Sequence, residues 1–237
     1  MKQIFLLFTI ISLIACKKDE VTVDETLYFP PLNSDSWEMT DPVDLDWNTN
    51  NLNSLYDYLS QQNTRAFIVL KNGKIVLEKY WGNNIYNTTS FDKNTIWYWA
   101  SAGKSLTACL TGIAQTKGYL NINNKSSDYL GQHWTNMSLD KENLILVKHQ
   151  LSMTSGLDYN VADLDNTEPS SLNYKADAGS QWYYHNAAYT LIEKIISNAT
   201  GLDYNQFSDE NLENKIGMTG SWILSGYNNI YWSTARD

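Results

Sequence analysis

The pattern of apolar and polar positions predicts a helix followed by an antiparallel hairpin. Apolar residues recur at helical spacing between about residues 49 and 62. Two β-rich runs follow over residues 66–70 and 75–81, and Asn72-Gly73 joins them. Asn-Gly between two such runs is the strongest short-range hairpin signal, because both residues tolerate a positive φ. We therefore predict a sheet with a helix on its face.

A second helix is predicted after Ser101 and ends near Gly118. Residues 119 to about 215 contain several helical stretches, including 143–153 and 187–199, and no comparable run of strands. We interpret this region as a helical lobe inserted after the first strands. The apolar face of the helix after Ser101 is formed by Leu106, Leu110, Ile113 and Ala114, and we expect Cys109 to pack on the same side.

The N-terminus has the pattern of a targeting segment. Lys2 gives a positive start, residues 4–14 are almost all apolar, and the run is too short to span a bilayer comfortably. The small residue before Cys16 resembles a bacterial lipobox, which predicts a signal peptide over residues 1–15 and an acyl chain on Cys16. An ordinary signal peptide that contains a cysteine is the alternative. Residues 16–48 are interpreted as anchor, tether and extended lead-in, and 49–237 as the folded domain.

Composition narrows the range of functions. The 237 residues are 43% hydrophobic, which is enough for a real core, and the net charge is −9. A nucleic-acid partner needs a basic stripe, and the sequence has none, so we exclude one. The two cysteines predict no disulfide framework, and the three histidines are too widely spaced for a metal site. We expect no cofactor, and a location in the bacterial cell envelope, held to the membrane by the lipid anchor.

The first candidate chemistry is a Ser-x-x-Lys pattern. Ser101 and Lys104 lie three residues apart on the predicted helix, hence on one face and within hydrogen-bond reach. An amine at that position can activate the hydroxyl, and the helix N-terminus favours a developing negative charge. The pattern is weak alone, because about one chance match is expected in a chain of this length. Ser138 and Lys141 form a second match, which we reject because no apolar helix face follows it.

A second candidate element is Tyr184-x-Asn186, which can project a phenol and an amide into one cleft. The same spacing at Tyr227 and Asn229 is taken as a chance match. His185, between Tyr184 and Asn186, could add a titratable group, but an outward-pointing side chain is favoured because histidine is often found at the surface.

Four segments then occur in the order seen in one family. They cover residues 99–105, 147–157, 178–189 and 233–237. The sequence resembles the β-lactamase-related serine hydrolases, which include penicillin-binding proteins and class C β-lactamases, and looks most similar to 6-aminohexanoate-dimer hydrolases. Glu168 resembles the deacylating glutamate of class A β-lactamases only superficially, because its loop is one residue too long, and we interpret it as a loop carboxylate.

The resemblance implies a fold and a reaction. The fold would be α/β (α+β), with an antiparallel sheet flanked by helices and an inserted helical lobe, and residues 233–237 would open a helix. Ser101 would attack a small amide, ester or peptide-like substrate to form an acyl-enzyme, and Lys104 and Tyr184 would move its proton. Asn186 would orient the lysine and bind the substrate amide. Amidase, esterase, peptidase and β-lactamase activities all remain open.

The sequence departs from the family pattern at its C-terminal end. The third element of the family, a Lys-Thr-Gly or His-x-Gly motif on a sheet strand, is absent from the sequence, which stops at Asp237. We therefore expect a chain without the C-terminal strands, which as given could be an inactive fragment. The alternative function is a non-catalytic surface lipoprotein that keeps the fold as a binding module.

Overall fold

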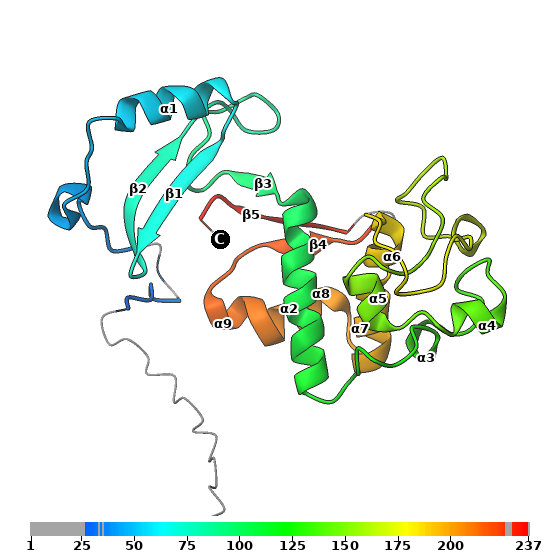
Figure 1. Ribbon diagram of the computed structural model, residues 1–237. Coiled ribbons are helices and arrows are strands. Elements are labelled where there is room, and N and C mark those ends of the chain that lie inside the picture. The colour runs from blue at the N-terminus through cyan, green and yellow to red at the C-terminus, as the bar shows by residue number, and fades with distance from the viewer. Residues whose placement is uncertain (1–26, 33, 35, 226–228, 237) are drawn as a thin grey trace, which may run out of the picture.

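The computed structural model describes residues 27–32, 34, 36–225 and 229–236 (Figure 1). The predicted signal peptide and the predicted lipid attachment at Cys16 lie outside these residues. Within the described ranges, no helix is long and apolar enough to cross a membrane.

The predicted helix and hairpin are confirmed. Helix α1 covers Leu52–Gln61, and strands β1 (Ala66–Lys71) and β2 (Lys74–Tyr80) pair antiparallel. The turn between them has φ of 50° at Asn72 and 82° at Gly73, as the Asn-Gly pattern requires. A Cβ at Gly73 would also lie 1.8 Å from the carbonyl oxygen of Tyr28, so only glycine fits there.

The lead-in runs along the free edge of β2. The Thr40 amide donates to the Ile75 carbonyl at 2.9 Å, and the Ile75 amide donates to the Glu38 carbonyl at 2.9 Å. The Trp37 indole donates to the carbonyl of Gly73 at 2.7 Å. These bonds cover the start of an edge that would otherwise be open to pairing with another chain. A short 3₁₀ turn, η1 (Pro42–Leu45), then leads towards α1.

A second sheet of three short strands was not predicted from the sequence. Strands β3 (Ile96–Tyr98), β5 (Ile230–Thr234) and β4 (Ser221–Ile223) pair antiparallel in that order. The expectation that residues 233–237 open a helix is wrong, because Ser233 and Thr234 pair with Trp97 and Ile96 as the end of β5.

The two sheets are joined by a charged pair. The Arg236 guanidinium, just after β5, donates to both carboxylate oxygens of Glu78 on β2, at 2.5 and 2.6 Å. The hydrogen bond from Arg236 is the main reason why the pKa of Glu78 lies below its ordinary value. Such a bidentate pair fixes geometry as well as adding energy.

In the chain, helices and turns fill the stretch between β3 and β4, which confirms the helical region predicted over residues 119 to about 215 (Figure 1). The predicted helix over 143–153 is too long: extended backbone at Leu146 precedes α5 and a φ of 57° at Met153 follows it. The helix predicted over 187–199 is present but divided at Leu191. The elements are η2 (Ala100–Ala102), α2 (Gly103–Thr116), α3 (Ser127–Leu130), α4 (Leu139–Glu142), α5 (Val147–Leu151), η3 (Pro169–Ser171), α6 (Asn186–Thr190), α7 (Ile192–Thr200), α8 (Tyr204–Ser208), the π-helical turn η4 (Asp209–Glu213) and α9 (Asn214–Ile216).

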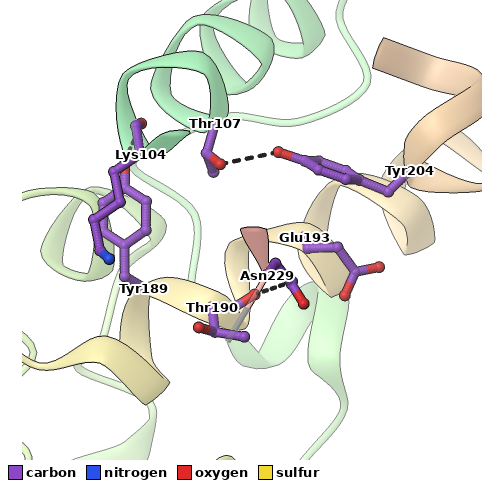
Figure 2. A pocket seen from close by; sticks show the side chains of 7 residues that line it. All are labelled: Lys104, Thr107, Tyr189, Thr190, Glu193, Tyr204 and Asn229. Atoms are coloured by element: carbon purple, nitrogen blue, oxygen red, sulfur yellow. Dashed lines mark hydrogen bonds between the residues drawn. The ribbon is translucent and has the colours of Figure 1, made fainter. Parts of the chain in front are cut away.

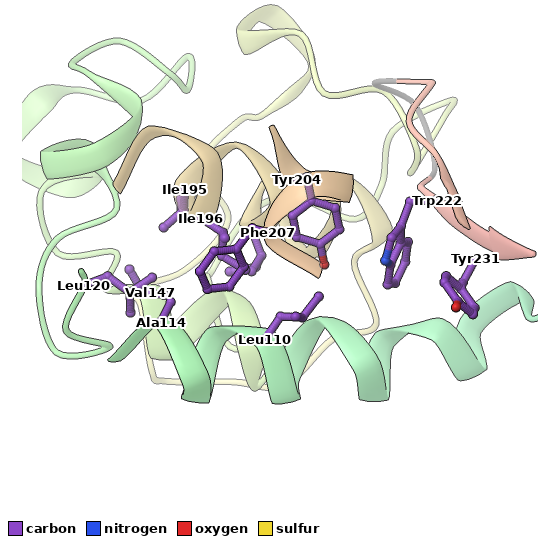
Figure 3. Close-up of a cluster of buried hydrophobic side chains, with 11 residues drawn as sticks. Leu110, Ala114, Leu120, Val147, Ile195, Ile196, Tyr204, Phe207, Trp222 and Tyr231 are labelled. Carbon is purple, nitrogen blue, oxygen red and sulfur yellow. The ribbon is translucent and has the colours of Figure 1, made fainter. Parts of the chain in front are cut away.

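The core places the start of α2 against the second sheet (Figure 3). Leu110 of α2 is fully buried and belongs to the same cluster as Tyr204, Phe207, Trp222 and Tyr231. The prediction for Cys109 is wrong: it is exposed, because it lies off the buried face of α2. That buried face consists of Gly103, Thr107, Leu110, Thr111 and Ala114.

Candidate active site

Ser101 lies in the 3₁₀ turn η2, immediately before α2. This turn is fixed to strand β5 from the preceding residue: the Trp99 amide donates to the Tyr231 carbonyl at 2.8 Å, and its indole donates to Ser233 Oγ at 2.8 Å. Ser101 therefore lies at a helix N-terminus, as the sequence predicts, and the residue two before it is hydrogen-bonded to the central strand of the second sheet.

The residue before Ser101 has strained backbone. Ala100 has a φ of 45°, a region that costs a non-glycine residue about 1–2 kcal/mol. We expect Ala100→Gly to raise the free energy of unfolding by about 0.5–1 kcal/mol, because glycine removes the strain. Urea denaturation measures the change.

Ala102 provides the matched control for this substitution. Its φ is −61°, in the ordinary helical region, so Ala102→Gly should lower the free energy of unfolding by about 0.5–1 kcal/mol. An equal fall in the free energy of unfolding for both glycine variants would show that the backbone at Ala100 is not strained.

The structure brings Ser101, Lys104 and Tyr184 together. Lys104 Nζ donates to Ser101 Oγ at 3.3 Å, and the Tyr184 hydroxyl donates to the same oxygen at 2.6 Å. Lys104 Nζ also lies 5.3 Å from the ring centre of Tyr184 and 5.6 Å from that of Tyr189. A nucleophile with two proton-handling groups on one oxygen is the arrangement that acyl transfer needs.

The electrostatics of Tyr184 favour loss of its proton. Burial alone would raise its pKa, but the hydrogen bond to Ser101 and the bond to and charge of Lys104 outweigh burial, so the pKa of Tyr184 lies below its ordinary value. The carboxylate of Asp165 acts in the opposite direction, together with burial. Tyr184 is thus suited to pass a proton between the serine and another group.

Asn186 is the first residue of α6, directly after Tyr184 and His185. Its side-chain oxygen is buried, and no described residue donates a hydrogen bond to it. The amide of the next residue, Ala187, donates to the Leu164 carbonyl at 2.8 Å, which anchors the start of α6 to the loop before it. A buried amide oxygen without a donor among the described residues has the capacity to accept one more hydrogen bond.

The expectation for His185 is wrong, because its side chain points inward. It is 2% exposed, and Nδ1 accepts from the Ala188 amide at 3.3 Å as the cap of α6. Burial lowers the pKa of His185. Its function in the structure is to begin the helix that carries Asn186, since helix N-termini need an acceptor for their free amides.

The residues that the sequence analysis set aside have other surroundings. Lys141 of the second Ser-x-x-Lys pattern pairs with Asp177 at 2.6 Å, and Glu168 is an exposed residue that precedes η3. Within the described ranges, no group of three His, Cys, Asp or Glu side chains could hold a metal ion.

Sequence reasoning missed two residues next to Lys104. Tyr189 is buried, and its hydroxyl donates to the Lys104 carbonyl at 2.7 Å, which ties α6 to α2. Asn229, dismissed above as part of a chance match, lines a cavity together with Lys104 (Figure 2). The one signal for Tyr189 in the sequence is its position five residues after Tyr184. Nothing in the sequence marks Asn229.

Comparison with known proteins agrees with this geometry. The sequence profile of the β-lactamase family matches residues 57–236, which is more than half of the chain. The chain belongs to the β-lactamase family. Among curated proteins, no match to this sequence was found.

Solved structures of this family share the fold. A Bacteroides dorei protein provisionally assigned as a β-lactamase is 23% identical, with a TM-score of 0.63, and the match covers 81% of this chain and 61% of that one. A Bacillus anthracis protein provisionally assigned as a 6-aminohexanoate-dimer hydrolase is 16% identical, with a TM-score of 0.70 and coverage of 89% and 62%. FmtA from Staphylococcus aureus is 18% identical, with a TM-score of 0.62 and coverage of 85% and 64%.

These structures confirm the predicted β-lactamase/transpeptidase-like fold, with helices and small antiparallel sheets. The predicted resemblance to β-lactamases, penicillin-binding proteins and 6-aminohexanoate-dimer hydrolases is confirmed as well. The chain spans about three fifths of the length of the structures it matches.

Proposed function

We propose that the protein is a serine hydrolase that cleaves an amide or ester bond through an acyl-enzyme intermediate. The observation that carries the proposal is the convergence of Lys104 Nζ and Tyr184 Oη on Ser101 Oγ. Members of the β-lactamase family are serine hydrolases that act in this way, which supports it. A small-molecule amide, ester or peptide-like compound is the proposed substrate.

In the first half of the reaction, Ser101 Oγ attacks the substrate carbonyl carbon. Its proton passes to the neutral amine of Lys104 or to the phenolate of Tyr184 as the Oγ–C bond forms, and the carbonyl oxygen takes the negative charge. The bond from carbon to the leaving nitrogen or oxygen then breaks, and the leaving group receives a proton from Tyr184, which Lys104 replaces if Lys104 took the serine proton. Asn186 holds the substrate amide through its unpaired side-chain oxygen.

In the second half, a water molecule attacks the acyl-enzyme. Tyr184 and Lys104 take a proton from the water, the Oγ–C bond breaks, and Ser101 recovers the proton. The substrate acid leaves with the oxygen of the water. The same two groups therefore serve as base and acid in turn, which requires that both lie within reach of Ser101 Oγ, as they do.

Hydrolysis of p-nitrophenyl esters by the full-length protein tests the proposal. We expect a burst of p-nitrophenol equal to the enzyme concentration followed by slower turnover, because acylation precedes deacylation. Ser101→Ala should give neither burst nor turnover. If folded wild-type protein shows no release above the Ser101→Ala control, the hydrolase proposal fails and a binding module takes its place.

A further inference from the structure

The turn that carries Ser101 packs on two aromatic side chains of the second sheet. Figure 3 shows Trp222 of β4 and Tyr231 of β5 side by side over the first turns of α2. A Cβ on Gly103, the first residue of α2, would lie 3.4 Å from the Trp222 ring and 3.6 Å from Tyr231 Cβ, so Gly103 packs directly on both. The Trp99 ring meets the Tyr231 ring edge-on, with 5.5 Å between their centroids. Residues on both sides of Ser101 therefore contact Tyr231.

A buried carboxylate fixes both aromatic side chains. The Tyr231 hydroxyl donates to Glu213 Oε2 at 2.8 Å. The Ser208 hydroxyl donates to the other carboxylate oxygen, and the Trp222 indole donates to Ser208 Oγ at 3.2 Å. All four side chains are at most 4% exposed. The π-helical turn η4 makes the arrangement possible, because a π turn places residues five apart, here Ser208 and Glu213, on one face.

The same turn contains the strained backbone of Ala100, with its φ of 45°. Strain of this kind persists only where the surrounding contacts hold it in place. Here those contacts converge on Tyr231, whose carbonyl accepts from the Trp99 amide at 2.8 Å and whose side chain packs against Trp99 and Gly103. The main chain of Tyr231 thus holds the turn, while its hydroxyl is held by Glu213. One side chain joins the buried carboxylate to the strained turn.

We infer that Glu213 and Tyr231 are positioning residues for Ser101. Their hydrogen bond fixes the Tyr231 side chain against the strained turn, which keeps Ser101 Oγ within reach of Lys104 and Tyr184. Both residues act through the turn, because the hydrogen bonds recorded at Ser101 Oγ come from Lys104 and Tyr184. The effect on acylation rests on the proposed function. The link between Tyr231 and the turn rests on the contacts alone.

Tyr231→Phe tests the inference, because it removes the hydroxyl and keeps the ring. We expect fluorophosphonate acylation of the folded variant to slow by about 10–10²-fold, since a small misplacement of a reacting group has a cost of this size. Glu213→Gln keeps the size of the side chain and one acceptor oxygen, so it should slow acylation by a smaller factor. A loss of stability alone would not change the rate measured on fully folded protein.

Tyr80→Phe is the matched control. The Tyr80 hydroxyl also donates to a glutamate, Glu78, but both residues lie on β2 in the first sheet. The variant therefore makes the same chemical change away from the turn that carries Ser101, and its acylation rate should equal that of the wild type. Equal rates for folded Tyr231→Phe and folded Tyr80→Phe would overturn the inference.

Ala100→Gly tests whether Tyr231 acts through the strained turn. Glycine adopts a positive φ without strain, so the turn in this variant needs less support from Tyr231. Tyr231→Phe should therefore slow acylation less in the Ala100→Gly protein than in the wild type. Effects at independent sites would multiply instead. An equal slowing in both proteins would overturn the route through the turn.

Urea denaturation separates this inference from the proposed function. If wild-type protein is not acylated at all, the hydrolase proposal fails, and the urea midpoints of the same variants decide the link to the turn. Ala100→Gly should raise the midpoint of the wild type more than that of Tyr231→Phe, because the strain relaxes once its support is lost. An equal rise in both would overturn the link. If Tyr231→Phe does not fold, Glu213→Gln takes its place in each comparison.

Discussion

Lys104→Met is expected to slow acylation of Ser101 by about 10²–10⁴-fold, the usual contribution of a positioned acid-base group. Methionine keeps the length and the apolar stem of the side chain but removes the amine that bonds to Ser101 Oγ at 3.3 Å. Tyr184 alone would then have to take the serine proton. Stopped-flow measurement of the p-nitrophenyl ester burst gives the rate directly.

Lys141→Met is the matched control, because Lys141 belongs to the second Ser-x-x-Lys pattern but pairs with Asp177. Its acylation rate should equal that of the wild type. Equal rates for Lys104→Met and Lys141→Met would show that Lys104 does not activate Ser101, and the proton transfers would then have to be assigned to Tyr184.

Glu142→Ala is expected to lower the free energy of unfolding by about 3–5 kcal/mol. The Glu142 side chain is fully buried, and it accepts from the His133 amide at 2.8 Å, the Thr135 amide at 2.9 Å and Thr135 Oγ at 2.7 Å. Alanine would leave these three donors without a partner in the interior and open a cavity. The bond to the His133 amide also helps to fix the backbone at His133, whose φ is 66°.

Urea denaturation of Glu142→Ala beside Glu210→Ala measures this effect. Glu210 is exposed, so its loss should change the free energy of unfolding by less than about 0.5 kcal/mol. If the two variants had equal stability, the buried carboxylate would not organise the helical lobe. Acylation of the Glu142 variant below its unfolding midpoint should remain, since Glu142 does not contact the Ser101 site.

The parts of the fold that the sequence predicted are those with a local cause. The α1 helix follows from apolar spacing, and the β1–β2 hairpin follows from Asn72-Gly73, whose positive φ angles are required by the turn. Ser101 and Lys104 could be paired because three residues on one helix turn fix their separation. The spacing of Tyr184-x-Asn186 made Tyr184 a candidate, and only the order of the family segments linked it to Ser101, since the contact spans 83 residues.

The parts that were missed depend on contacts that are distant in sequence. The second sheet pairs Trp97 with Ser233, and strands this short leave no periodic pattern. The inward orientation of His185 comes from the free amides of α6, which needed an acceptor at that position. The cavity that Lys104 lines brings together residues of four separate segments, so nothing in the chain marks Asn229.

The central claim is that Ser101 is a nucleophile activated by its two neighbours. Intact-protein mass spectrometry after incubation with a fluorophosphonate, followed by peptide mapping, tests it most directly. The account predicts one adduct per chain, located on Ser101 and lost in Ser101→Ala. A folded wild-type protein that gains no adduct, or an adduct that persists at full yield in Ser101→Ala, would contradict it.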